Sequence, residues 1–217
     1  ASPPRDRLGL LLLGQPGVGK TAVVAAVAAE LGAVEGAGLE TVLGSVRAPE
    51  DFLGLPLPDG TGGVAYAPPA WARRLEAHCR EGKTGVLFLD EISSAPPAVQ
   101  GALLRVVHEH VVGDLALPAS VAVIAAANPV EIAAGGWDMA APLASRFCTV
   151  NFPCPDADAW AGWMLAQEGV PARARALAAA FVRARPTLLH ELNGDVAKNS
   201  AVLARKPLAF ATPRGHA

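Results

Sequence analysis

The sequence predicts an α/β fold with a parallel sheet between two layers of helices, followed by a small all-helical domain. Apolar runs of strand length recur through the first two thirds of the chain, and helical patterns separate them. Continuous apolar runs are typical of strands that are buried on both faces. Because strands that alternate with helices form parallel sheets, the order of these patterns indicates the fold class.

The elements can be placed in order along the chain. Strong strand signals cover residues 8–13, 86–89 and 121–126, and weaker ones cover 40–43 and 148–152. Helical patterns cover residues 20–31, 68–80 and 96–108 between these strands, and Gly32 and Gly82 follow the first two as stop signals. Residues 45–69 are rich in glycine and proline, and their length predicts an irregular functional loop or insertion.

The pattern changes at about Pro155, after which no strand-like run occurs. Helical patterns follow over residues 156–168, 171–184, 187–192 and 196–203. Because Pro153 and Pro155 flank the change, we expect an α/β domain over residues 1–153 and a helical domain over 154–217.

Composition excludes several classes of protein. The 217 residues are 52% hydrophobic and 18% charged, which excludes disorder, and their net charge is −2. This charge gives no reason to expect attraction to nucleic acid or anionic lipid. No apolar run reaches the length of a membrane span, and the three cysteines lack the paired spacing of a zinc site. We expect a cytoplasmic protein.

A phosphate-binding loop follows the first strand. Its residues, which fit the pattern GxxxxGK[ST], are Gly14, Gln15, Pro16, Gly17, Val18, Gly19, Lys20 and Thr21. Glycines let the backbone N–H groups surround phosphates at a helix N-terminus, and the lysine reaches the β and γ phosphates. The hydroxyl of Thr21 is expected to ligate Mg²⁺. The loop sits between a buried strand and a helix, as this chemistry requires.

Two carboxylates end the strand over residues 86–89, at the sheet edge where ligands of parallel sheets bind. We expect Asp90 to hold Mg²⁺ and Glu91 to act as the general base for a water molecule that attacks the γ-phosphate. No Asn/Thr-Lys-x-Asp guanine motif is present, so ATP is the expected nucleotide. Asn128, at the end of the strand over 121–126, is a candidate to orient that water.

Together these motifs resemble those of the AAA+ ATPases, a group of P-loop NTPases, and within them the MoxR-like group. Residues 14–21 resemble Walker A, 87–91 resemble Walker B, and Asn128 resembles the sensor-1 residue. Residues 142–147 resemble the L-x-x-R-F segment of the group, and 212–214 resemble its sensor-2 S-P-R. On this resemblance, residues 1–153 are the AAA+ nucleotide-binding domain and 154–217 the lid, incomplete at its C-terminus.

The resemblance implies roles for two arginines. Arg146 is expected to reach the nucleotide of a neighbouring subunit, and Arg214 to reach the γ-phosphate from the lid. Guanidinium groups suit both roles because they stay charged and pair with phosphate oxygens. For each arginine a structural role, such as a surface salt bridge for Arg146, remains the alternative. The chain ends three residues after Arg214.

The resemblance also covers two insertions. Residues 47–56 are similar to the insert in the group's second helix, and 111–118 are similar to its β-hairpin before sensor 1, with Gly113 and Asp114 at the turn. Such projections contact clients in AAA+ rings.

The implied function is ATP hydrolysis by a ring, expected to be a hexamer, that acts as a chaperone on a protein client. The resemblance also suggests a partner with a von Willebrand type A domain. The alternatives are a nucleic-acid motor of helicase type, a chelatase-associated subunit, or a nucleotide-dependent scaffold without turnover. Against the nucleic-acid motor, residues 45–69 carry Arg47 against Glu50, Asp51 and Asp59, a net excess of acid.

Overall fold

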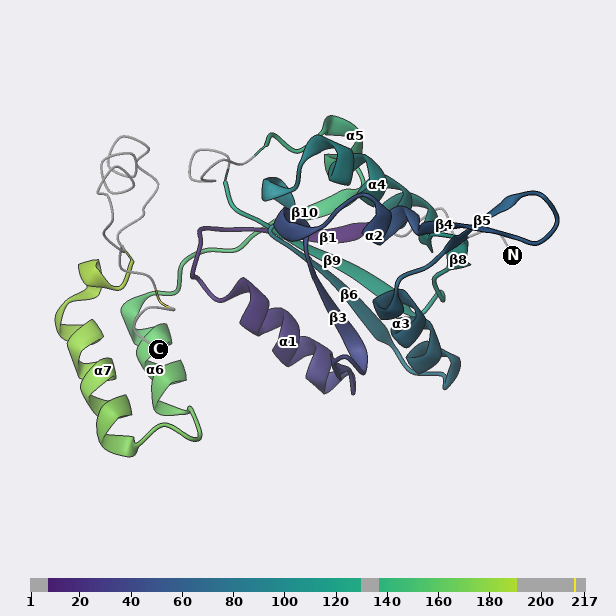
Figure 1. Cartoon of the computed structure of the whole chain (residues 1–217). Coiled ribbons are helices and arrows are strands. Elements are labelled where there is room, and N and C mark those ends of the chain that lie inside the picture. The colour runs from purple at the N-terminus through teal and green to yellow at the C-terminus, as the bar shows by residue number, and fades with distance from the viewer. Residues whose placement is uncertain (1–7, 130–136, 191–212, 214–217) are drawn as a thin grey trace. The chain divides into compact units, whose positions relative to one another are not determined.

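The structure is a computed structural model that describes residues 8–129, 137–190 and 213 (Figure 1). Its described residues divide into two compact units, one within Ala1–Leu13 and Thr21–Val150 and the other within Gly14–Lys20 and Asn151–Ala217. Arg214 and the helix expected over 196–203 lie outside the described residues.

The first unit contains a six-stranded sheet with the strand order β10-β1-β9-β6-β3-β2. The strands are β1 (Gly9–Leu13), β2 (Val34–Glu35), β3 (Gly38–Leu43), β6 (Gly85–Asp90), β9 (Val121–Ala127) and β10 (Phe147–Asn151). The pairs β1/β9, β9/β6, β6/β3 and β3/β2 are parallel. The predicted parallel sheet and its five predicted strands are therefore confirmed, and β2 is an addition at the edge.

The strand order explains why helices cover both faces. Four of the helices that connect these strands are α1 (Lys20–Glu30), α3 (Ala70–Arg80), α4 (Pro97–Glu109) and α5 (Ala141–Ala144). The connection from β1 to β3 moves one way across the sheet, and those from β3 to β6, β6 to β9 and β9 to β10 move the other way. Since crossovers between parallel strands are right-handed, α1 lies on one face and the other three helices on the opposite face.

Burial along β6 agrees with these two layers. Leu87 and Leu89 belong to a core cluster that includes Leu75 of α3 and Leu103 of α4. Phe88 points to the other face and is also buried, at 1% exposure. The strand therefore has apolar side chains on both faces, as its continuous apolar run predicts.

An ion pair between a buried carboxylate and a half-exposed arginine ties α3 to the sheet. Glu40 on β3 is 3% exposed, and its carboxylate accepts hydrogen bonds from Arg74 Nε at 2.8 Å and Nη2 at 2.6 Å. These hydrogen bonds and the charge of Glu40 raise the pKa of Arg74. The pairing satisfies a carboxylate that would otherwise be buried without a partner.

Residues 45–69 are more regular than predicted. They contain part of the 3-10 helix η1 (Gly44–Val46), then α2 (Glu50–Leu53) and an antiparallel hairpin of β4 (Leu55–Pro58) and β5 (Val64–Ala67). The expectation of an irregular segment, which rested on its length and its glycine and proline content, was wrong because this hairpin accommodates its prolines. Asp59 N donates to Gly63 O, so Pro56 and Pro58 fall at positions whose amide faces outward, where no N–H is needed.

The hairpin predicted within residues 111–118 is confirmed as β7 (Val111–Val112) and β8 (Leu115–Ala116). It is joined to the first hairpin by a reciprocal pair of hydrogen bonds. Tyr66 N donates to Asp114 Oδ2 at 2.6 Å, and Asp114 N donates to Tyr66 O at 2.9 Å. A side chain at Gly113 would come within 2.6 Å of Tyr66 O, so this close approach requires glycine. The two hairpins thus form one projection, the paired hairpins.

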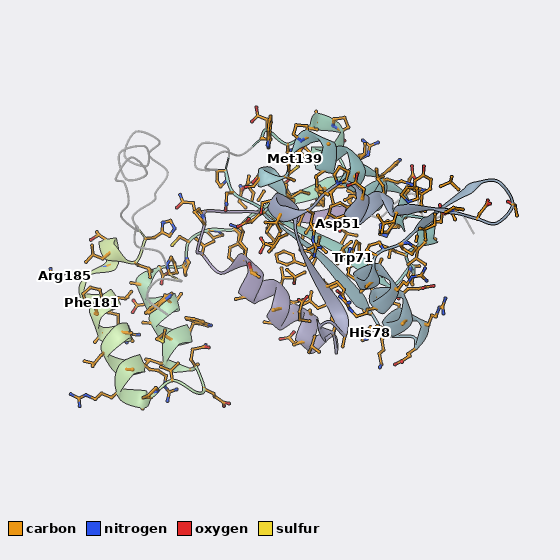
Figure 2. The ribbon with its side chains drawn as sticks, viewed as in Figure 1. Asp51, Trp71, His78, Met139, Phe181 and Arg185 are labelled. Atoms are coloured by element: carbon orange, nitrogen blue, oxygen red, sulfur yellow. The ribbon has the colours of Figure 1, made fainter. Side chains whose placement is uncertain are left out.

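The paired hairpins rest on the core through an aromatic contact. Phe52 of α2 packs edge to face against Trp71 of α3, with ring centroids 6.4 Å apart. Trp71 is labelled in Figure 2. Gly113 N also donates to Phe52 O at 3.1 Å. The base of the projection is therefore packed against the helices of the first unit.

The second unit contains α6 (Ala157–Leu165), α7 (Ala172–Ala184) and the 3-10 helix η4 (Pro186–Leu188). The Asp156 side chain caps α6 by accepting from Ala159 N at 2.7 Å. The apolar sides of α6 and α7 meet around Trp160, Met164 and Val182. Within the described ranges, no helix is both long enough and apolar enough to cross a membrane.

We expect Arg74→Ala to lower the thermal unfolding midpoint by several degrees, because it leaves Glu40 buried without its partner. Arg73→Ala is the matched control, since Arg73 is an exposed neighbour on the same helix. Circular dichroism melts of both variants would test this, and equal midpoints would show that the ion pair does not stabilise the fold.

Candidate functional site

The parallel register brings the polar strand ends to one edge of the sheet. Leu13 at the end of β1 lies opposite Ala127 at the end of β9. Leu43 at the end of β3 lies opposite Asp90 at the end of β6. Because all these strands run in the same direction, the segments that follow them leave the sheet at the same edge. We call this the polar edge.

Thr21 and Asp90 meet at the polar edge, although 69 residues separate them in the sequence. Thr21 Oγ1 donates to Asp90 Oδ2 at 2.8 Å. A hydroxyl and a carboxylate are oxygen ligands of the kind that Mg²⁺ prefers, with the remaining ligands supplied by phosphates and water. The donor set therefore fits the predicted ion. No group of three or more metal-binding side chains occurs in the described part of the chain.

Glu91 is held by a residue that the sequence did not single out. Its backbone has φ 55°, in the left-handed region, which is uncommon for a residue with a side chain. Ser45 Oγ donates to Glu91 Oε2 at 2.7 Å, and Glu91 N donates to Asp90 Oδ1 at 2.9 Å. Ser45 follows the end of β3, so its position after a strand next to β6 was the signal that could have found it.

Asn128 lies directly after β9 and is linked to the loop after Glu91. Its backbone N–H donates to Ser93 Oγ at 3.3 Å, and Ser93 is 3% exposed. This contact ties the end of β9 to the 3-10 helix η2 (Ile92–Ser94), which immediately follows Glu91. The two predicted water-positioning residues thus belong to adjacent, mutually bonded segments.

The phosphate loop, residues 14–21, follows β1 and ends in the first turn of α1. Lys20 is 8% exposed, and its Nζ donates to Gly14 O at 2.6 Å and to Gln15 O at 2.9 Å. A Cβ at Gly14 would lie 2.4 Å from Phe152 O, so only glycine fits there. The loop therefore wraps around its own lysine ammonium and packs against the chain that follows β10.

One polar atom of the phosphate loop has no partner among the described residues. Gln15 Oε1 is buried and makes no hydrogen bond. An unsatisfied buried acceptor costs free energy. Phosphate oxygens also only accept hydrogen bonds, so this oxygen would be completed by a water molecule and not by the phosphates themselves.

Arg146 is not brought to the polar edge. It lies just before β10, and its carbonyl accepts from Gly9 N at 3.0 Å, at the beginning of β1. Since strands rise about 3.3 Å per residue, the five residues of β1 separate its two ends by roughly 13 Å. The guanidinium contacts Pro142 O and Ser145 Oγ, and no carboxylate among the described residues pairs with it.

Gln100 links the segment before Arg146 to the loop after β6. It is 2% exposed, and its side chain donates to Ala95 O at 3.1 Å and accepts from Ala140 N at 2.8 Å. Ala140 immediately precedes α5, which ends two residues before Arg146. The position of Arg146 is therefore tied to the segment that follows Glu91.

A groove of about 600 Å³ lies away from the polar edge. It is lined by residues at the beginnings of β1 and β9, among them Leu10, Ser120 and Ile124. Because it lies at the opposite ends of the strands from Asp90 and Thr21, it is separate from the candidate site.

Comparison with known proteins finds similarity to solved structures and to one protein family. Two solved structures similar to the chain are a RuvB mutant of Thermotoga maritima and NtrX of Brucella abortus. The first shows 19% identity and a TM-score of 0.47, and the similarity covers 78% of this chain and 43% of that one. The second shows 20% identity and a TM-score of 0.47, and it covers 98% of this chain and 50% of that one. The chain thus spans half or less of these structures.

No curated protein matches the chain. The family assignment rests on the sequence, because residues 9–147 match the AAA domain of the dynein-related subfamily. That range begins with β1 and ends just after Arg146, so it contains the whole polar edge. Since it also covers well over half of the chain, the chain belongs to the AAA domain family of ATPases, in the dynein-related subfamily.

Proposed function

We propose that the chain binds ATP with Mg²⁺ and hydrolyses it within a ring that remodels a protein client, in the manner of MoxR-like AAA+ ATPases. The hydrogen bond between Thr21 and Asp90 carries the proposal. It brings the last residue of the phosphate loop to the first of the two strand-end carboxylates. That pair is what a P-loop NTPase uses to hold Mg²⁺ beside the β and γ phosphates.

Each residue then has a definite task. The backbone of residues 14–20 and the Lys20 ammonium bind phosphate oxygens, for which Lys20 exchanges its bonds to the loop carbonyls. Thr21 and Asp90 would hold Mg²⁺, which neutralises phosphate charge when bound. Glu91 accepts a proton from the attacking water, and Asn128 orients that water.

The location of Arg146 supports a ring. At the far end of β1 it cannot reach the nucleotide of its own chain, yet a guanidinium that pairs with no carboxylate among the described residues is suited to a phosphate supplied by another chain. Arg146 would therefore complete the site of a neighbouring subunit, and each chain would contribute to two sites. A hexamer is the proposed size, and Arg214 would act from the lid.

The paired hairpins are the proposed client contact. Leu55, Leu57, Val64 and Tyr66 are each more than 40% exposed on this projection. Exposed apolar groups of this kind favour a protein over a nucleic acid, as does the excess of acid nearby. Only nine residues lie between Ser45, bonded to Glu91, and the start of the first hairpin at Leu55, so client contact and hydrolysis are closely connected along the chain. A partner with a von Willebrand type A domain and a cytoplasmic location belong to the same proposal.

Lys20→Ala should weaken ATP binding at least about tenfold, because hydrogen bonds to charged groups contribute roughly 1.5–3 kcal/mol. Calorimetry with Mg²⁺ and a non-hydrolysable ATP analogue measures this. Lys83→Ala is the matched control, since Lys83 is an exposed lysine paired with Glu81. If the unmodified chain does not bind the analogue, or if Lys20→Ala binds it equally well, nucleotide binding by this loop is excluded.

Ser45→Ala should raise the basal ATPase rate several-fold and leave nucleotide affinity within about twofold. The Ser45 hydroxyl restrains the Glu91 carboxylate through this hydrogen bond, so its loss leaves the carboxylate free to turn toward the attacking water. Ser45→Thr keeps the hydroxyl and should behave like the unmodified chain. Steady-state rates and calorimetry on the same samples separate the two effects, and an unchanged rate in Ser45→Ala would show that this bond does not control Glu91.

Arg146→Ala should retain ATP binding and lose most hydrolysis, since an arginine supplied by a neighbouring subunit is typically worth at least 10³-fold in rate. Glu91→Gln should also be inactive, because it removes the proposed general base. Mixing the two variants tests the shared site, because Glu91→Gln subunits can lend their arginine to Arg146→Ala subunits. Activity in the mixture is expected, and a mixture as inactive as its components would contradict the arrangement.

A further inference from the structure

A histidine of the second unit contacts the phosphate loop. His190 Nε2 lies 3.3 Å from Pro16 O, at a hydrogen-bonding distance, and both residues belong to the same compact unit. Leu189, the preceding residue, is 3% exposed and belongs to the core of α6 and α7. Leu189 N also donates to Pro186 O, in η4, at 3.1 Å. The histidine therefore extends from an anchored segment.

The contact matters because its acceptor, the Pro16 carbonyl, fixes the direction of the next backbone N–H. The Pro16 carbonyl and the Gly17 N–H belong to one planar, trans peptide unit, in which C=O and N–H point in opposite directions. Whatever holds the carbonyl to one side also holds the Gly17 N–H to the other. Gly17, at φ 78°, has no side chain to restrict its backbone, so the peptide would otherwise rotate readily.

The neighbouring peptide cannot substitute for this one. Pro16 has no N–H, so the peptide between Gln15 and Pro16 offers nothing to a phosphate. After Gln15, the next backbone donor in the loop is therefore that of Gly17. Because anion binding by such a loop depends on N–H groups that converge, the direction of this single peptide affects phosphate affinity.

We infer that His190 is a positioning residue for the phosphate loop. Its ring donates from Nε2 to Pro16 O and thereby turns the Gly17 N–H toward the phosphates of the nucleotide. The inference rests on the proposed function, since it assigns His190 to the same nucleotide. If His190 has this role, phosphate affinity depends on the segment that follows η4 as well as on the phosphate loop.

The test compares His190→Gln with His190→Asn. Glutamine places an amide N–H where the histidine Nε2 lies, whereas asparagine is one methylene shorter and cannot reach Pro16 O. We expect His190→Gln to bind within about twofold of the unmodified chain and His190→Asn to bind about five- to tenfold more weakly, the effect of one hydrogen bond. Calorimetry with Mg²⁺ and ADP, and with Mg²⁺ and pyrophosphate, measures the affinities.

The two ligands separate possible roles of the histidine. If His190 acts through the phosphate loop, His190→Asn weakens ADP and pyrophosphate to the same extent. Weaker ADP binding with unchanged pyrophosphate binding would instead indicate a contact with the nucleoside and overturn the inference. Equal affinities of the two variants would overturn it as well.

Two controls separate a failure of this inference from misfolding of the variants and from a failure of the proposed function. The unfolding midpoints of both variants without nucleotide should match, because the exchange of one amide side chain for another leaves the core of α6 and α7 intact. If the unmodified chain binds neither ADP nor pyrophosphate, the proposed function itself fails. If it binds both and the variants do not differ, only the role of His190 fails.

Discussion

The hydrogen bond between Thr21 and Asp90 depends on the parallel register of the sheet. Asp90 ends β6 and Thr21 follows the loop after β1, and β9 lies between these two strands. A shift of one residue in either pairing would turn the Asp90 side chain to the other face and separate the two oxygens. The buried apolar strands therefore do more than stabilise the fold, since their register places the oxygen ligands of the predicted ion.

The strands that place Thr21 and Asp90 could be predicted from the sequence, because β1, β6 and β9 each carry a strong local signal. A continuous apolar run identifies a strand buried on both faces, and the direction of parallel strands then implies that Asp90, Glu91 and Asn128 leave the sheet at one edge. The hairpin within residues 45–69 could not be predicted in this way. Pro56 and Pro58 look like strand breakers locally, and only the register shows that their missing N–H groups face outward.

The residues that sequence reasoning missed all act through long-range contacts. Ser45 holds Glu91 across 46 positions, Arg74 pairs with Glu40 across 34, and His190 meets Pro16 across 174. Serine, arginine and histidine are also common on surfaces, so their identity alone indicates no role. Arg146 was found only because its surrounding segment resembles that of a family, and its distance from the polar edge is a feature of the three-dimensional structure.

Ser45 and His190 act on different steps of the proposed reaction. Ser45 contacts Glu91, the proposed general base, so in that proposal it can change the rate of hydrolysis without changing how tightly phosphates bind. His190 contacts the loop that surrounds the phosphates, so it can change affinity without touching the base. Ser45 lies on the chain just before the paired hairpins, whereas His190 follows the helices of the second unit. A client at the hairpins would therefore affect turnover, and a change in the helical segment would affect nucleotide retention.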